Sequence, residues 1–389
     1  MIINQTKKLL VFALAAVVFT ACRKDAKIQE PENELSEESF YGKGGHNDRD
    51  TDKGFVYTLG NQTDDNKVLI YRRNKDGKLS YVASESTGGK GTGGGLGNQG
   101  AVILVEKRDL LLAVNPGSNT ISSFKITHSG LHLVSQVYSG GEQPVSITEN
   151  DGVVYVLNSG GEGNIAGFRL SYYGKLYPIH NSKRPLSSTM AGGAQVSFVL
   201  DGRVLVITEK ATNKIITYTV NHFGYPGSFH SITAANATPF GFATGRFGKI
   251  YVSEAAGGAE GASTLSSYQV YYNGYIRLIT GPVATNQSAA CWVVLTDNER
   301  YAYTTNTGSN SVSSFSANFF GKIELEEAAA GMTEAGPIDA DFSKNSRYMY
   351  VLNAGSQSIS VFSVAHNGSL TSIQTVSDLP AGATGMAAD

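Results

Sequence analysis

The residues of this chain best suited to chemistry are two glutamates and a lysine, Glu209, Glu254 and Lys210. Each glutamate ends a strand-like run, VITE and YVSE, where other copies of the run end in asparagine, and Lys210 follows Glu209 directly. Two carboxylates near a lysine can activate water and stabilise an oxyanion in a hydrolytic reaction. A solvated rim or a structural ion pair would explain the same residues, so both interpretations stay open.

A second group of residues lies at the starts of candidate inner strands or at the ends of the strands that follow them. We expect these residues to bind a small ligand; they are Gln99, Gln195, Trp292, Asn306, Asp339 and Asn353. Trp292 is the single tryptophan, and it can either stack on a sugar ring or fill the core between two sheets. Asparagine at a strand end also satisfies the backbone of a turn, which is the alternative role for Asn306 and Asn353.

The sequence predicts no cofactor, no metal site and no nucleic-acid partner. No histidine, cysteine, aspartate or glutamate cluster has the spacing of metal ligands. The formal net charge of −2 does not favour a polyanion as partner. The glycine-rich run at 88–95 lacks the Gly-Lys-Ser/Thr order of a phosphate-binding loop, and we interpret it as a flexible connection. Cys291 lies among apolar residues, an environment that raises the pKa of a thiol and makes it inert.

The elements that position these residues follow a repeat of about fifty residues. Tight-turn glycines recur at spacings of 53, 44, 50, 50, 47 and 47 residues; they are Gly77, Gly130, Gly174, Gly224, Gly274, Gly321 and Gly368. Runs such as YVLN, which end in Asn or Glu, recur with the same period. Several short strands in each of many such repeats are typical of a β-propeller. We interpret each repeat as strands A (inner) to D (outer), with the glycine in the turn between C and D.

The two ends of the repeat array predict how the ring closes. The array begins at Gly54 with a B strand and ends with a lone A strand at Gly382–Asp389, which can complete the first blade and cover its edge. The sequence therefore predicts an all-β, seven-bladed β-propeller over residues 54–389, closed by the C-terminal strand. The B–C and D–A loops then lie on one face, the loop face, and the A–B and C–D turns lie on the other, the turn face.

The first 53 residues have the composition of a targeting segment followed by a tether. Two lysines, an apolar run at 9–19 and small residues before Cys22 predict an export signal over residues 1–21. The cysteine makes the segment resemble the lipobox of bacterial lipoproteins, which implies cleavage before Cys22 and acylation of its thiol. Residues 22–53 are polar and acidic, which predicts a disordered tether spanning roughly 30 Å as a coil. We therefore expect a lipid-anchored protein of the bacterial cell envelope, either periplasmic or surface-exposed.

Four consecutive C–D turns carry aromatic residues next to the turn glycine. We call this set the aromatic arc; it comprises Tyr172, Tyr173, Phe223, Tyr271, Tyr272, Phe319 and Phe320. Because the four turns belong to neighbouring blades, these rings should form one exposed surface on the turn face. Large exposed apolar patches usually mark interfaces, so we expect the aromatic arc to contact an envelope partner. The alternative is that half of the rings fold back over the outer strands.

The repeat YVLN-x-G…N-x-I…F…G-x-L, seen best at Tyr303–Asn306 and Tyr350–Asn353, resembles the YVTN-type repeat. The body of the chain is similar to the seven-bladed lactonase-type propeller family, which includes 6-phosphogluconolactonases and carboxymuconate-cyclising enzymes. That resemblance implies a small lactone or sugar as ligand and histidine and arginine around the channel. No histidine stands at the inner-strand starts here. We therefore expect a ligand- or partner-binding protein on a lactonase-like scaffold, with a lactone hydrolase using Glu209, Glu254 and Lys210 as the alternative.

Overall fold

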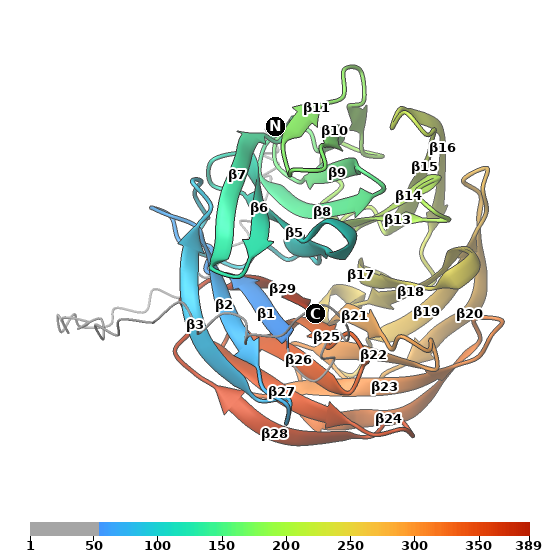
Figure 1. Ribbon diagram of the computed structural model, residues 1–389. Coiled ribbons are helices and arrows are strands. Elements are labelled where there is room, and N and C mark those ends of the chain that lie inside the picture. Colours follow the sequence, from blue (N-terminus) through green and yellow to red (C-terminus); the bar gives the residue numbers. More distant parts are fainter. Residues whose placement is uncertain (1–53) are drawn as a thin grey trace, which may run out of the picture. The chain divides into compact units, whose positions relative to one another are not determined.

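The computed structural model describes residues 54–389, which form seven antiparallel sheets arranged around a centre as the blades of a propeller (Figure 1). The predicted fold class, an all-β, seven-bladed propeller, is confirmed. The predicted signal segment, the lipidated Cys22 and the tether lie outside the described residues.

The blades run in chain order, and each has four main strands. The A strands are β29 (Thr384–Ala388), β4 (Val102–Val105), β8 (Pro144–Asn150), β13 (Gly193–Val199), β17 (Pro239–Thr244), β21 (Ala290–Leu295) and β25 (Pro337–Phe342). The B strands are β1 (Gly54–Leu59), β5 (Leu110–Asn115), β9 (Val153–Asn158), β14 (Val204–Glu209), β18 (Lys249–Glu254), β22 (Tyr301–Asn306) and β26 (Tyr348–Asn353). The C strands are β2 (Lys67–Arg73), β6 (Thr120–Thr127), β10 (Asn164–Leu170), β15 (Lys214–Val220), β19 (Thr264–Val270), β23 (Ser311–Ala317) and β27 (Ser358–Val364).

The outer strands complete the sheets. The D strands are β3 (Leu79–Ser86), β7 (Gly130–Tyr138), β11 (Leu176–Pro178), β16 (Pro226–Thr233), β20 (Ile276–Ala284), β24 (Ile323–Met332) and β28 (Leu370–Val376). In the third blade the outer position is shared by β11 and a short β12 (Arg184–Pro185), which both pair with β10. Three short 3-10 turns, η2 (Glu106–Arg108), η3 (Arg246–Gly248) and η4 (Ala256–Gly258), lie between strands.

The B strands are buried along nearly their whole length because each is covered by a neighbouring blade on both sides. In β14, Leu205 and Ile207 pack in the cluster shared with the third blade, whereas Val204 and Val206 pack in the cluster shared with the fifth. Alternate side chains of a strand point to opposite faces of its sheet, so an apolar run suits a strand buried on both faces. The core therefore lies between blades.

The two repeat markers found in the sequence contact each other across the blade boundaries. The tyrosine hydroxyl of the YVLN-type run donates to the carbonyl of the next blade's turn glycine, from Tyr155 to Gly224 over 2.8 Å and from Tyr303 to Gly368 over 2.6 Å. Ser123 donates in the same way to the Gly174 carbonyl over 2.5 Å. Each of these C–D turns is thus held by the blade before it.

The closing strand forms as predicted. Strand β29 pairs antiparallel with β1, with Val56 opposite Ala388 and Leu59 opposite Thr384 (Figure 1). One strand start differs from the sequence analysis: the inner strand of the second blade begins at Val102 and not near Gln99. The reason is that the residues before it, 97–100, leave the blade and enter the channel, as described below.

Candidate functional site

Glu209, at the loop-face end of β14, is fully buried. Its Oε1 accepts a hydrogen bond from the backbone amide of Ser187 over 2.8 Å, and its Oε2 accepts from the hydroxyls of Ser187 and of Thr212, the latter over 2.5 Å. The interpretation of Glu209 as a carboxylate on a solvated rim is therefore wrong. The carboxylate instead joins its own B–C loop to the outer segment of the third blade.

Glu254, at the end of β18, is also fully buried and has the same kind of partners. Its carboxylate accepts hydrogen bonds from the hydroxyls of Thr264, Ser266 and Tyr268 over 2.6, 2.7 and 2.9 Å. The equivalent Asn353 donates to the hydroxyls of Ser358 and Ser360 over 3.1 and 2.9 Å. Glutamate and asparagine at the end of a B strand thus both bind the C strand of their own blade. A solvated rim position is therefore wrong for Glu254 as well.

The asparagines at the other B-strand ends follow this pattern. Asn306, expected to bind a ligand, is buried and donates to Ser311 and Ser313 over 3.0 and 2.9 Å. These side chains satisfy local hydroxyls inside the sheet. The local structural role that the sequence left open therefore describes Asn306 and Asn353.

Lys210 points away from Glu209 and toward the channel. Its Nζ donates to the carbonyl of Gly97 and lies 4.8 Å from the centroid of the Phe240 ring. Burial lowers the pKa of Lys210 below its ordinary value. The structure therefore does not bring the lysine and the two glutamates into one site.

The loop-face mouth of the channel is filled by the chain's own segment 97–100. The side-chain amide of Gln99 pairs with the backbone of Val293 in the sixth blade, donating over 2.8 Å and accepting over 3.2 Å. The backbone amide of Gln99 donates to the Ala194 carbonyl in the fourth blade over 3.2 Å. The glycine-rich connection, interpreted as flexible, thus ends in a segment tied to several inner strands.

The other channel residues are engaged in the same way. Gln195 pairs with the backbone of Phe242, donating over 3.0 Å and accepting over 2.6 Å. Trp292 is buried, its ring lies 4.9 Å from that of Phe240, and its Nε1 donates to the Asn98 carbonyl over 2.5 Å. Burial raises the pKa of the Cys291 thiol to about 12. The core role for the tryptophan, one of the two alternatives, is the one its contacts support.

Asp339 and Asp341 lie on β25 against the closing strand. Burial raises the pKa of Asp339 well above its usual value, and the backbone amide of Ala340 donates to its Oδ1 over 2.9 Å. Asp341 accepts from the backbone amide of Ala388 in β29 over 2.9 Å, and burial raises its pKa to about 7. The expectation that Asp339 binds a ligand has no open space to support it, because Asp339 is buried.

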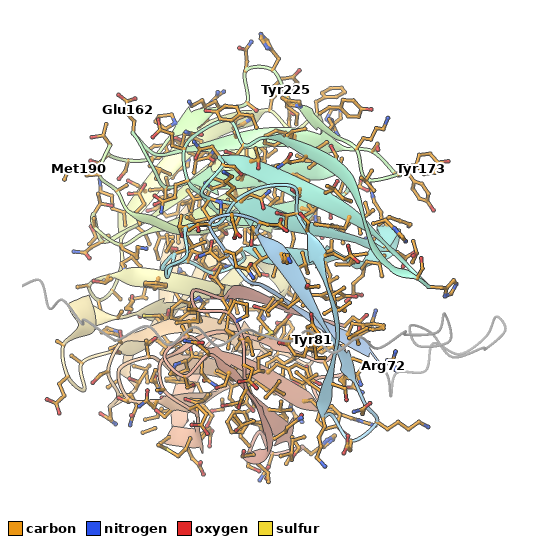
Figure 2. All side chains as sticks on the ribbon, turned by 90° about the vertical axis from the view of Figure 1, so that its left-hand side faces the viewer. Arg72, Tyr81, Glu162, Tyr173, Met190 and Tyr225 are labelled. Carbon is orange, nitrogen blue, oxygen red and sulfur yellow. The ribbon has the colours of Figure 1, made fainter. Side chains whose placement is uncertain are left out.

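The turn face differs in exposing its side chains. Every member of the aromatic arc is exposed, with Tyr173 at 77% and Phe320 at 74%, so the rings do not fold back over the outer strands. Figure 2, an edge-on view, shows Tyr173 on the side of the propeller opposite Glu162 and Met190 of the loop face. Their role as an interface stays a prediction.

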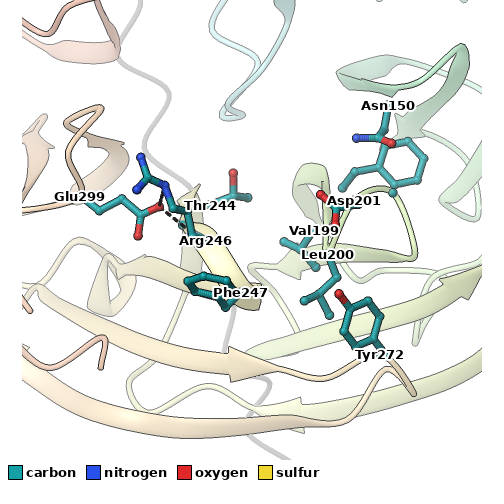
Figure 3. Close-up of a pocket in the computed structure, with 12 residues that line it drawn as sticks. Asn150, Val199, Leu200, Asp201, Thr244, Arg246, Phe247, Tyr272 and Glu299 are labelled. Carbon is teal, nitrogen blue, oxygen red and sulfur yellow. Dashed lines mark hydrogen bonds and ion pairs between the residues drawn. The ribbon is translucent and has the colours of Figure 1, made fainter. Parts of the chain in front are cut away.

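A cleft with a volume of about 430 Å³ also opens on this face (Figure 3). It lies between A–B turns of neighbouring blades. The residues that line it are Asn150, Phe198, Val199, Leu200, Asp201, Gly202, Thr244, Gly245, Arg246, Phe247, Tyr272 and Glu299. Asn150 and Asp201 stand on one side, and Arg246 and Glu299 stand on the other. A concave site with a few converging polar groups and aromatic rings suits a small ligand.

Phe247 at the cleft is held in a conformation that its residue type disfavours. Its φ and ψ are 60° and 28°, and the amide of Lys249 donates to the Arg246 carbonyl across the turn. A bulky side chain with positive φ is a strained outlier, and this ring is 68% exposed, so it gains little core packing in return. The strained and exposed ring is therefore a candidate for contact with a ligand.

Charged groups connect the cleft to the aromatic arc. Glu299 Oε2 lies 3.4 Å from the buried Nζ of Lys249, which donates to the Phe319 carbonyl over 2.9 Å. Glu299 Oε1 lies 3.5 Å from Nε of Arg246 and accepts from its backbone amide over 2.6 Å. The rings of Phe247 and Phe319 are 6.0 Å apart. The cleft and the arc therefore form one continuous surface.

Sequence reasoning missed Arg246, Phe247 and Glu299. The signal for Phe247 was a bulky residue directly before a turn glycine, Gly248, where asparagine or glycine is usual. No local pattern indicated that Glu299 contacts Arg246 of the fifth blade, because the two residues are 53 positions apart along the chain.

The described residues, 54–389, contain no group of three or more His, Cys, Asp or Glu side chains placed to hold a metal ion. No helix within this range has the length and apolar character needed to cross a membrane.

Comparisons with known proteins now place the chain. Residues 277–389 match the sequence model of the family described as lactonase, 7-bladed beta-propeller. No curated protein matches the sequence. Similar solved structures include a candidate 6-phosphogluconolactonase from Bacteroides fragilis, with 17% identity, a TM-score of 0.70, and coverage of 88% of this chain and 100% of that one.

Two more structures show the same fold. A candidate 6-phosphogluconolactonase from Bacteroides uniformis has 18% identity, a TM-score of 0.68, and coverage of 86% of this chain and 99% of its own. The periplasmic gluconolactonase of Pseudomonas aeruginosa has 17% identity, a TM-score of 0.65, and coverage of 85% and 98%. At such identities the likeness shows the fold alone. Residues 277–389 thus match the lactonase propeller family in sequence, and the described residues form a seven-bladed propeller.

Proposed function

We propose that this protein is an envelope-anchored binding propeller that holds a small polyhydroxylated ligand, such as a sugar or sugar acid, in the turn-face cleft. The observation that carries the proposal is the strained, exposed Phe247 ring beside the polar groups of Arg246, Asn150 and Asp201 in a cleft of about 430 Å³. An aromatic face can stack on a sugar ring, and the polar groups can bind its hydroxyls.

Arg246 is the residue best placed to recognise an acidic group on that ligand. Its side chain is 66% exposed, and its guanidinium contacts are long, 3.5 Å to Glu299 Oε1 and 3.4 Å to the Asp297 carbonyl. Contacts of this length are weak hydrogen bonds at best, so the guanidinium can turn toward a carboxylate at little cost.

The ligand proposal is tested by titrating sugars, aldonates and their lactones into the full chain and measuring heat or ligand-observed NMR signals. Arg246→Ala should weaken binding of an acidic ligand by about tenfold or more, since charged hydrogen bonds contribute about 1.5–3 kcal/mol. Arg347→Ala is the matched control, because this exposed arginine occupies the A–B turn of the seventh blade. Equal binding by both variants would remove Arg246 from the site.

The envelope anchor is the second part of the proposal and rests on the lipobox-like segment ending at Cys22. Mass spectrometry of the N-terminal peptide should find lipid on Cys22 of the wild-type protein and none in Cys22→Ser, and this readout does not depend on any other membrane contact of the propeller. A wild-type peptide without lipid would contradict acylation at this cysteine.

A lactone hydrolase remains the second candidate, favoured by the names of the similar structures. Against it, Glu209 and Glu254 are fully buried and Lys210 is directed elsewhere. The test is hydrolysis of the same lactone panel by the wild-type chain and by the Glu209→Gln, Glu254→Gln double variant. Turnover that disappears in a folded double variant would support the hydrolase and overturn a purely binding role.

A further inference from the structure

We propose that the turn face docks on the surface of a lipid bilayer, with the aromatic arc at the depth of the lipid head groups. The inference rests on the envelope anchor of the proposed function but is independent of what the cleft binds. Four observations support it: the placement of the rings, the charge of their turns, the point where the chain enters the propeller, and the rigidity of the turns.

The rings of the aromatic arc project from the tips of four neighbouring blades. Their turns are 171–175, 221–225, 271–275 and 318–322, and each is closed by a hydrogen bond that the backbone amide of the turn glycine donates. Tyr225 and Tyr275, exposed in the same turns, extend the surface. Tyrosine prefers the boundary between water and hydrocarbon, where its apolar ring and its polar hydroxyl are both satisfied, and exposed phenylalanine adds apolar surface that can enter the lipid.

The charge of these four turns suits an anionic lipid surface. None of the four contains an aspartate or glutamate, and two carry a lysine, Lys175 and Lys322. The corresponding turn of the first blade reads Asn-Lys-Asp-Gly-Lys at 74–78 and has neither a ring nor a surplus of apolar surface. Lysine beside exposed rings is the pattern by which proteins attach to membranes containing anionic lipids.

The chain enters the propeller from this same face. Gly54 is the first residue of β1 and pairs with Arg73, which is the last residue of β2 before the turn at 74–78. Cys22 therefore precedes the turn-face entry by 31 intervening residues. A tether that leaves from the turn face allows this face to meet the membrane without the chain passing around the propeller.

The turns are held in place before any contact is made. The carbonyls of Gly174, Gly224 and Gly274 accept hydrogen bonds from Ser123, Tyr155 and Thr217 of the preceding blades over 2.5, 2.8 and 2.6 Å. Binding therefore loses little backbone entropy, which favours docking by a preformed surface. The cleft lies at the inner edge of this surface and would face the head groups.

The first experiment measures the depth of each face in the lipidated full chain, reconstituted in vesicles of phosphatidylethanolamine and phosphatidylglycerol. A fluorophore is attached either at Lys175→Cys, in the turn that carries Tyr172 and Tyr173, or at Met190→Cys on the loop face. The Met190 side chain is 80% exposed. Labelling is selective because Cys291 is buried and Cys22 is expected to carry lipid. Brominated lipids should quench the probe at 175 several-fold more than the probe at 190. Equal quenching would overturn the proposal.

The second experiment does not need the anchor. The full chain with Cys22→Ser is floated with the same vesicles, with and without Tyr173→Ser, Phe223→Ser and Phe320→Ser. The triple variant should lose about tenfold or more in partitioning, because each ring brings of order 100 Å² of apolar surface. The control is His366→Ser with Asn367→Ser, in the equivalent turn of the seventh blade, which should bind as well as its parent.

These results separate docking from its alternatives. Lipid on Cys22 of the wild-type protein, together with vesicle binding by the Cys22→Ser chain, supports both the anchor and the docking face. No vesicle binding, together with self-association that the triple variant abolishes in sedimentation, would assign the arc to a second copy of the chain and overturn membrane docking. Vesicle binding equal in parent and triple variant would also overturn it.

Discussion

The loop face and the turn face of this propeller both carry polar and aromatic side chains, but these side chains are buried on one face and exposed on the other. On the loop face, Glu209, Glu254 and Trp292 are buried, and their polar atoms contact the protein's own groups. On the turn face, Phe247 and Phe320 are exposed, and Phe247 is held at a positive φ. The first arrangement stabilises the fold, whereas the second costs stability. Exposure combined with strain, and not residue type, is therefore the basis on which we propose the turn face as the functional one.

The largest test of this contrast compares one aromatic from each face. Trp292→Ala should lower the free energy of unfolding by about 3–5 kcal/mol, because it leaves a cavity against Phe240 and removes the bond to the Asn98 carbonyl. Phe320→Ala should change it by about 0.5 kcal/mol or less, as expected for an exposed side chain. Urea unfolding of the full chain measures both. Similar losses would erase the distinction between the faces.

The buried glutamates give the next largest effect. Glu209→Gln and Glu254→Gln should each cost about 1–3 kcal/mol, since the new NH2 group faces hydroxyls that donate in the native protein. If the two glutamates lay on a solvated rim, as one interpretation of the sequence has it, the same substitutions would change the free energy of unfolding very little. Thermal or urea unfolding decides between the two, with Glu162→Gln on the exposed B–C loop of the third blade as control. A cost near zero would place the carboxylates in solvent after all.

The seam that joins the first and last blades is expected to respond to pH. Because the pKa of Asp341 is raised to about 7, the folded protein binds this proton more tightly than the unfolded chain does. Its contribution to stability is present in full below about pH 4, falls as pH rises toward 7, and is lost above that. We expect roughly 2–3 kcal/mol less stability at pH 8 than at pH 5 from this group. Asp341→Asn should reduce the difference, and the exposed Asp297→Asn should not.

The smallest effect has the opposite sign and tests the turn face directly. Phe247→Asn should raise the free energy of unfolding by roughly 0.5–1 kcal/mol, because Asn-Gly is the preferred pair for a turn with two positive φ angles. The same change should weaken ligand binding in the cleft. Stability and binding are measured on one preparation. A destabilised variant would show that the ring packs usefully and is not strained for function.

The architecture could be read from local pattern because its signals repeat. Seven glycine turns and the YVLN-type runs recur at one period. An array that begins with a B strand and ends with a single A strand forms a complete ring when that A strand pairs with the first B strand. The exposure of the aromatic arc also followed from sequence, since a side chain next to the glycine of an outer hairpin turn has no second sheet to cover it.

The candidate site could not be read in this way, because its contacts join residues far apart along the chain. Gln99 meets Val293 and Trp292 meets Asn98, each across 194 positions, so no local pattern showed that the channel mouth is filled. Glu209 and Glu254 ended their strands as predicted, but hydroxyls on other segments decided that both are buried. The cleft likewise exists only where turns of successive blades meet. Periodicity determines which blade a residue belongs to, whereas packing between blades decides whether its side chain reaches a ligand.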